Sequence, residues 1–195
     1  MPPVLMYHSI GESLGRPYAY LYVTPAQFEE QVKYMADNGY TFLFPDEMYY
    51  ADRCEKPVVI TFDDGYVDNF DQALPVLKRY NAKATVFVAG SNIDQQWMLT
   101  KQQIRQMADS GLVNIGSHTL AHGDLTKLDG AALQEEMAGS QWLLEKITGK
   151  KIEDLRGVVN GAGIAGIAIA KLLLLYGFTD VTLCDRQGII RSGME

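Results

Sequence analysis

Cysteine, histidine and basic charge are all scarce in this chain of 195 residues. Its two cysteines, Cys54 and Cys184, form no CxxC pair and are too few for a disulfide framework, so they indicate no redox compartment. The net charge of −7 argues against a basic surface that would bind nucleic acid or anionic lipid. Only three histidines are present, and two of them lie close together in the sequence.

Hydrophobic runs long enough to span a membrane are also lacking. Residues 157–178 are largely apolar, but Asn160 and Lys171 interrupt them, and the unbroken stretch 161–170 is too short to cross a bilayer. No basic residue precedes Arg16, so we expect no signal peptide and leave the cellular location open. Apolar residues make up 47% of the chain and charged residues 21%, which is typical of a globular protein.

The pattern of the chain alternates between strands and helices. Apolar, β-branched runs predict strands at 3–10, 41–44, 57–64, 84–88 and 112–116. Helices are expected from Thr24 to Gly39, around 70–80 with Pro75 as a kink or late start, from Thr100 to Gly111, and at 131–147. Repeated strand–helix units favour a parallel sheet or a barrel, in which chemistry gathers at the carboxyl ends of the strands.

The first candidate motif is TFDDGY, residues 61–66, at the end of the expected strand 57–64. Two adjacent carboxylates are energetically costly there, because Asp63 and Asp64 repel each other and both lie close to a desolvated region. This cost makes a metal-binding or catalytic role worth considering. The residues by themselves also fit an acidic turn in which Gly65 supplies the bend.

The second motif is SHTLAH, residues 117–122, after the strand 112–116. His118 and His122 are four residues apart, so one helical turn or a tight loop can direct both imidazoles to one point. Two polar loop histidines are the alternative. With one carboxylate of the first motif, the pair makes a set of three ligands with an open fourth position, as in hydrolytic zinc sites. The remaining aspartate would then take a proton from water.

These motifs resemble those of the polysaccharide deacetylases, the carbohydrate esterases of the NodB-homology type. The resemblance covers about residues 3–150 and rests on PVLMYHSI, TFDDGY, ATVFVAG, HTLAH and their spacing. It implies an α/β fold, an incomplete distorted (β/α) barrel of polysaccharide deacetylase type. It also implies a divalent metal, usually zinc, and an N-acetylated sugar polymer or oligomer as the partner.

Carried over to this sequence, the resemblance implies that Asp63 is the catalytic base. It implies that Asp64, His118 and His122 are the metal ligands. Water activated at the metal would hydrolyse the acetamide to acetate and a free amine. The resemblance assigns no residue to an organic cofactor.

Two later motifs of the family are missing from this chain. One carries a proline, but the last proline here is Pro75. The other carries a histidine that acts as the general acid, but the last histidine is His122. We therefore expect residues 1–150 to form a truncated deacetylase domain with impaired activity.

A different pattern follows in GVVNGAGIAG, residues 157–166. Gly161, Gly163 and Gly166 form GxGxxG between an expected strand and helix, and Asp185 ends a second expected strand. This Rossmann-like βαβ unit resembles the opening of the nucleotide-binding domain of malic enzymes. We expect residues 151–195 to be a fragment of such a domain, joined to the first part near residues 147–156.

Three functions stay open at this point. The first is metal-dependent deacetylation of an N-acetylated polysaccharide. The second is an NAD-binding oxidoreductase fragment of malic-enzyme type, although one βαβ unit supplies only half of a dinucleotide crevice. The third is a non-catalytic chimeric product, in which the terminal unit covers an open sheet edge. A deacetylase variant whose next βα unit has drifted into GxGxxG form is the alternative to a chimera.

Overall fold

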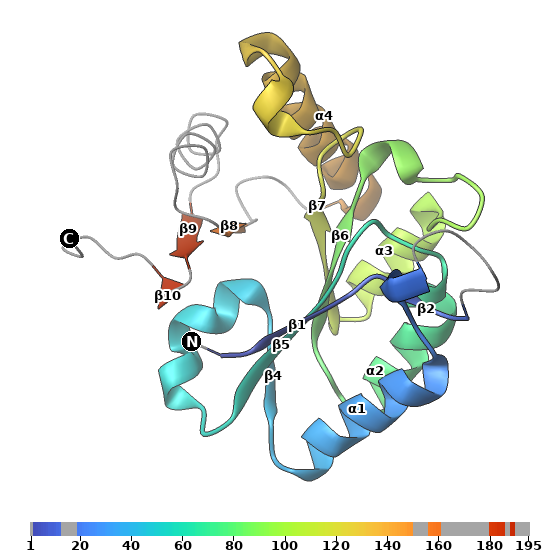
Figure 1. Ribbon diagram of the computed structural model, residues 1–195, viewed down its shortest axis with the longest axis vertical. Helices are drawn as coiled ribbons and strands as arrows, with labels where there is room; N and C mark the ends of the chain where they lie inside the picture. Colours follow the sequence, from blue (N-terminus) through green and yellow to red (C-terminus); the bar gives the residue numbers. More distant parts are fainter. Residues whose placement is uncertain (1, 13–18, 150–155, 161–179, 186–187, 190–195) are drawn as a thin grey trace.

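A five-stranded parallel sheet is the centre of the molecule (Figure 1). The computed structural model describes residues 2–12, 19–149, 156–160, 180–185 and 188–189. The strands are β1 (Val4–Tyr7), β4 (Thr41–Leu43), β5 (Pro57–Phe62), β6 (Ala84–Val88) and β7 (Val113–Ser117). Their order is β1-β5-β6-β7, and β4 also pairs with β5. All these pairs are parallel, so the carboxyl ends of the strands meet at one edge.

Helices follow most of these strands, as predicted. They are α1 (Pro25–Asp37), α2 (Leu74–Arg79), α3 (Lys101–Asp109) and α4 (Gly130–Thr148). Thr24 and Thr100 begin α1 and α3 with capping boxes, in which the threonine and a glutamine three residues later satisfy each other's backbone groups. The 3₁₀- and π-helical segments are η1 (Ala19–Leu21), η2 (Pro45–Arg53), η3 (Asn69–Ala73), η4 (Gly90–Asn92) and η5 (Leu125–Lys127).

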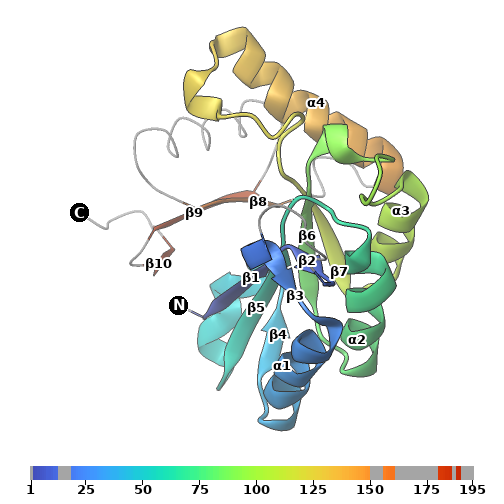
Figure 2. The same ribbon diagram turned by 45° about the vertical axis from the view of Figure 1, so that its right-hand side comes forward.

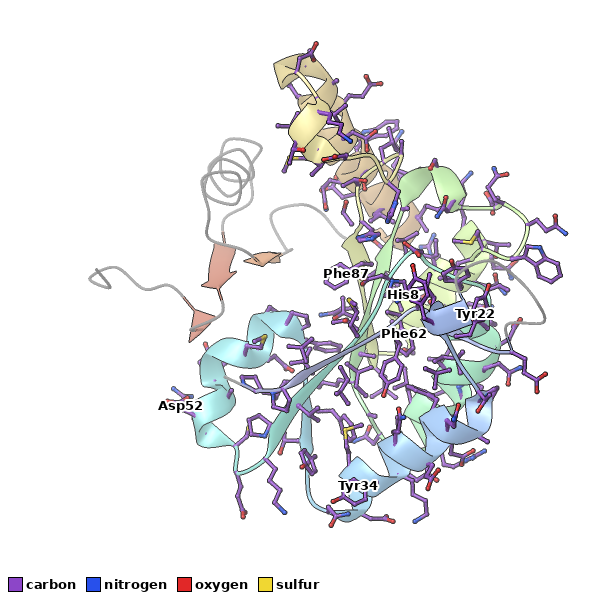
Figure 3. All side chains as sticks on the ribbon, in the orientation of Figure 1. His8, Tyr22, Tyr34, Asp52, Phe62 and Phe87 are labelled. Carbon is purple, nitrogen blue, oxygen red and sulfur yellow. The ribbon has the colours of Figure 1, made fainter. Side chains whose placement is uncertain are left out.

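The core alternates across β5, as expected for a strand buried on both faces. Val58, Ile60 and Phe62 pack into the large cluster formed with the helices, and Val59 points the other way onto Leu43 and Met48. Figures 1 and 2 show α1, α2 and α3 on the same side of the sheet, and Figure 3 labels Phe62 near its centre. This packing fixes the sheet edge that carries the polar motifs.

One local prediction needs correction, and one open alternative is decided. The first strand does not run through residues 3–10, because it breaks at His8 into β1 and a short β2 (Ser9–Ile10), which pairs with β3 (Tyr22–Val23). Of the two alternatives for Pro75, the late start is confirmed: α2 begins at Leu74, so Pro75 lies in its first turn, and the preceding segment η3 is a π-helix.

The α/β class is confirmed, but the sheet does not close. Across the described ranges, β1 stands at one end of the strand order and β7 at the other, and no strand joins them into a barrel. Strands β8 (Arg156–Asn160), β9 (Asp180–Asp185) and β10 (Gly188–Ile189) form a separate sheet. β8 and β9 are parallel, while the GxGxxG segment and the expected helix after it lie outside the described residues.

Within the same described residues, no helix combines the length and apolarity that crossing a membrane requires.

Candidate metal centre

The two polar motifs meet because the strands before them are parallel and lie on either side of β6. β5 ends at Phe62, directly before Asp63 and Asp64, and β7 ends at Ser117, directly before His118. The carboxyl end of β6 lies between them and holds the second loop, while Asp63 N–H donates to the carbonyl of Tyr7 in β1 at 2.9 Å. His118 N–H donates to the carbonyl of Val88, at a distance of 3.0 Å. Residues far apart in the sequence therefore share one edge of the sheet.

Asp64, His118 and His122 direct one ligand atom each to a common point. The Oδ1 atom of Asp64 lies 3.2 Å from Nε2 of His122 and 3.5 Å from Nε2 of His118. The two Nε2 atoms are 3.0 Å apart. Asp64 is mostly buried, whereas 55% of the His122 side chain is exposed, so solvent reaches the group from the side of His122.

This triangle fits a divalent cation. Ligand atoms bonded to a tetrahedral zinc at about 2.0–2.1 Å lie about 3.3 Å from one another, and the three observed separations bracket that value. Two imidazole nitrogens and one carboxylate oxygen are a donor set that zinc accepts, with room for a fourth ligand. Asp64, His118 and His122 could therefore hold a metal ion.

Burial shifts the pKa values of two groups at this site, Asp63 beside the triangle and His118 within it. It raises the pKa of the Asp63 carboxyl above its usual range, and the neighbouring charge of Asp64 adds to the rise. Burial also lowers the pKa of the His118 imidazole below its usual range. A neutral His118 presents the lone pair that metal binding needs, while a carboxyl with a raised pKa is a stronger base when ionised.

The backbone at both motifs adopts a conformation that is rare outside glycine. Asp64 has φ 72°, Thr119 has φ 66° and His122 has φ 56°. Such residues typically cost about 1–3 kcal/mol each, and they persist where surrounding contacts hold them. Gly65 follows with φ 83°, and a Cβ there would lie 3.1 Å from Val88, so the turn needs glycine.

Every backbone N–H of residues 118–122 has a hydrogen-bond partner. Besides His118, Thr119 N–H donates to the hydroxyl of Ser117 at 3.2 Å, and His122 N–H donates to the hydroxyl of Thr119 at 3.0 Å. The N–H groups of Leu120 and Ala121 donate to one oxygen of a carboxylate on α4, at 2.9 and 2.8 Å. That carboxylate belongs to Glu136.

On its other side the loop is held by the turn after β6. Gly90 N–H donates to the carbonyl of Thr119 at 3.0 Å, and Ser91 N–H donates to that of Leu120 at 2.7 Å. A Cβ on Gly90 would lie 2.8 Å from the Leu120 side chain, so a larger residue there would force that side chain to shift. The hydroxyls of Ser117 and Thr119 accept loop amides and so orient this loop as well.

Glu136, Asp68 and Asn69 are the residues near the site that sequence reasoning missed. Asp68 accepts from the hydroxyl of Ser9 at 2.5 Å, and the Asn69 side chain donates to the carbonyl of His8 at 2.7 Å, so both fasten the segment after β1. Glu136 lies in α4, and its spacing in that helix gives no sign of a loop contact. The partners of these side chains became evident only in the folded chain.

His8 and Trp97 lie outside the triangle. The charge of His8 lowers the pKa of Asp63, so His8 lies within electrostatic reach of that carboxyl. Figure 3 labels His8 on the segment that follows β1. Trp97 has φ 70°, its side chain is 54% exposed, and its carbonyl accepts from Val67 N–H. Neither residue is among the three that converge.

Comparison with known proteins agrees with this geometry. The family model for polysaccharide deacetylase matches residues 50–157, more than half of the chain. The chain belongs to the polysaccharide deacetylase family. YxkH of Bacillus subtilis, a protein named as a polysaccharide deacetylase, is 43% identical over 152 residues, 74% of this chain and 52% of that protein. This deacetylase-family chain thus spans about half the length of that curated relative.

Other members extend the similarity. A poly-β-1,6-N-acetyl-D-glucosamine N-deacetylase of Staphylococcus aureus is 29% identical over 122 residues, covering 58% of this chain and 42% of that enzyme. The crystal structure of a polysaccharide deacetylase from Bacillus cereus superposes with a TM-score of 0.79 at 32% identity. The superposition covers 98% of this chain and 60% of the chain in that structure.

The similarity to malic enzymes is confined to a short stretch. The bifunctional malic/malolactic enzyme of Bacillus subtilis is 50% identical over 48 residues, which are 25% of this deacetylase-family chain and 12% of that enzyme.

Proposed function

We propose that this chain hydrolyses N-acetyl groups of an N-acetylated polysaccharide with the help of a divalent metal ion. Zinc suits the donor set of two imidazoles and one carboxylate. The observation that carries the proposal is the convergence of Asp64, His118 and His122 beside Asp63 in a member of the polysaccharide deacetylase family. The staphylococcal relative, whose name gives poly-β-1,6-N-acetyl-D-glucosamine as its substrate, supports this substrate class. The products would be acetate and a free amine on the sugar.

Each group has a distinct role in the proposed reaction. Asp64, His118 and His122 hold the metal ion, which when bound polarises a carbonyl and makes water more acidic. Asp63 takes a proton from the attacking water, whose oxygen joins the acetyl carbon. The bond between that carbon and the amide nitrogen then breaks, and the nitrogen leaves as an amine once it has gained a proton. The raised pKa of Asp63 suits a carboxylate that accepts and returns this proton.

The same sequence suggests slow turnover. No histidine follows His122 and no proline follows Pro75 in these 195 residues, so this stretch carries neither late motif of the family. Acting by itself, it would have no imidazole from that motif to protonate the leaving amine, and Asp63 would return the proton. We therefore expect acetate release below that of a family member with the late histidine.

Acetate release tests the proposal. The purified chain is loaded with zinc, incubated with an oligomer of N-acetylglucosamine, and compared with an Asp63→Asn variant loaded in the same way. We expect slow release by the original chain and none above background by the variant. Equal release by both proteins would show that Asp63 is not the base. No release by either would contradict the deacetylase function of this chain.

We also propose that residues 1–150 and 151–195 are parts of different origin, a deacetylase domain and a fragment of malic-enzyme type. The 48-residue similarity to the malic/malolactic enzyme supports this division, and it is also the observation behind the second candidate function, NAD binding. Sequencing the source DNA across codons 140–160 tests the junction. If genomic DNA carries both parts in one uninterrupted coding sequence, the junction belongs to a natural gene. If the two coding sequences are not joined in genomic DNA, the junction is an artefact of assembly.

A further inference from the structure

Helix α4 holds the loop of the candidate metal centre by a single carboxylate. One oxygen of Glu136 accepts hydrogen bonds from two successive loop amides, Leu120 N–H at 2.9 Å and Ala121 N–H at 2.8 Å. These amides lie between His118 and His122. Hydrogen bonds to a charged acceptor are typically about twice as strong as neutral ones, so this carboxylate is a substantial support for the loop backbone.

The same face of α4 makes two more contacts with the loop region. Ser140, one helical turn after Glu136, shares a hydrogen bond of 2.5 Å with the hydroxyl of Ser117. Gly139 lies against Leu120, whose side chain would be 3.3 Å from a Cβ at that position. Glu136, Gly139 and Ser140 therefore form one surface of the helix that fits the loop.

The loop needs such support because its conformation is unfavourable by itself. Thr119 and His122 both have positive φ, and the Nε2 atoms of the two histidines approach within 3.0 Å. A short segment in this geometry would relax without external contacts, and relaxation would separate the two imidazoles. Among the backbone N–H groups of residues 118–122, those of Leu120 and Ala121 donate to a carboxylate, and the others donate to a carbonyl or a hydroxyl.

We propose that Glu136 is the positioning residue of this centre: through the amides of Leu120 and Ala121 it holds His118 and His122 in the arrangement that binds the metal ion. Glu136 touches neither histidine ring in the contacts described, so it acts through the backbone. The inference rests on the proposed function in so far as the loop serves a metal centre.

The test compares three variants of the full chain. Glu136→Ala removes the acceptor, Glu136→Gln keeps a neutral acceptor of the same length, and Glu135→Ala removes an exposed carboxylate from the neighbouring position as a matched control. Zinc affinity is measured by competition with a chromophoric chelator. Removal of groups that orient metal ligands typically weakens metal binding about 10- to 100-fold, and we expect that loss for Glu136→Ala. Glu136→Gln should recover part of it, and Glu135→Ala should bind zinc normally.

A second measurement does not depend on the metal. Amide hydrogen exchange of Leu120 and Ala121 is followed in the metal-free proteins by NMR. We expect both amides to be protected in the original chain and in Glu135→Ala, and to exchange faster in Glu136→Ala while amides of β6 keep their protection. A residue that merely stabilised the fold would lower the melting temperature and accelerate exchange throughout.

The two measurements separate the inference from the proposed function. If the original chain binds no zinc but Glu136→Ala still loses protection at Leu120 and Ala121, the metal centre is wrong and the positioning role stands. Unchanged protection at these amides in Glu136→Ala would overturn the inference. So would zinc binding by Glu136→Ala equal to that of the original chain.

Discussion

The Oδ1 atom of Asp64 lies 3.2 Å from Nε2 of His122, and both residues have positive φ. One residue follows β5 and the other ends the loop after β7, so the contact exists only because parallel strands bring their carboxyl ends together. Two polar residues held in uncommon backbone conformations and directed at one point are the pattern expected of a functional site.

Zinc should bind at about one ion per chain, because the centre offers three protein ligands and an open position. After chelation and reloading, the original chain should retain zinc and His118→Ala should lose it, as measured by mass spectrometry of the metal. Zinc at 100 times its dissociation constant should stabilise the fold by about 2.7 kcal/mol, seen as a higher melting temperature. Equal zinc content in the two proteins would argue against the centre.

Asp63→Asn should abolish acetate release without loss of zinc. The substitution keeps the size of the side chain and removes its ability to take a proton, which typically lowers a rate about 10²- to 10⁴-fold. Asp109→Asn, at an exposed position in α3, is the matched control and should keep both zinc and activity. Loss of zinc from Asp63→Asn would instead give Asp63 a part in metal binding.

Phe28→Ala should destabilise the fold by about 3–5 kcal/mol, measured by urea unfolding. Phe28 is fully buried in α1, and its ring packs against Tyr7 at 5.2 Å and Phe62 at 5.6 Å between ring centres. Tyr34→Ala changes an aromatic residue of the same helix that is 62% exposed, so it should cost far less. Similar losses for both would mean that α1 does not pack on β5 as described.

Tyr7 should make the fold less stable in alkali. Burial raises the pKa of its phenol above the usual 10.0. The unfolded chain then releases the phenol proton at a lower pH than the folded chain. The contribution of Tyr7 to the free energy of unfolding is therefore fully present below pH 10.0 and is lost as the pH rises through the pKa of the folded state.

Tyr7→Phe isolates this effect. It removes the hydrogen bond to Gln31, 2.6 Å long, which costs about 1 kcal/mol at any pH at which the phenol is protonated. Free energies of unfolding measured between pH 8 and 11 should therefore converge for the two proteins at the alkaline end. Parallel curves would mean that Tyr7 titrates alike in the folded and unfolded chains.

NAD should show no measurable binding to this chain. A dinucleotide crevice is built from two βαβ halves, and the stretch similar to malic enzyme supplies one at most. Isothermal calorimetry with NAD is the measurement. A dissociation constant in the micromolar range would contradict the prediction and would support the oxidoreductase alternative.

Much of the local structure was determined by the sequence. Continuous apolar runs placed β5 and β6 because strands covered on both faces need them. Thr24 and Thr100 placed the starts of α1 and α3 because their side chains satisfy the first amides of the helix. The same reasoning put Asp63, Asp64, His118 and His122 at strand ends. It could not foresee the break at His8, which depends on the pairing of β2 with β3.

Only the tertiary structure decided how the candidate centre is held. Sequence supplied the residue types and spacing of the ligands, since these follow from the chemistry of metal binding. It carried no sign that Glu136 would accept two loop amides, because a carboxylate on a helix surface looks the same whether it faces water or a neighbouring loop. The order of the strands in the open sheet, β1-β5-β6-β7 with β4 also on β5, likewise depends on which strands pair in space.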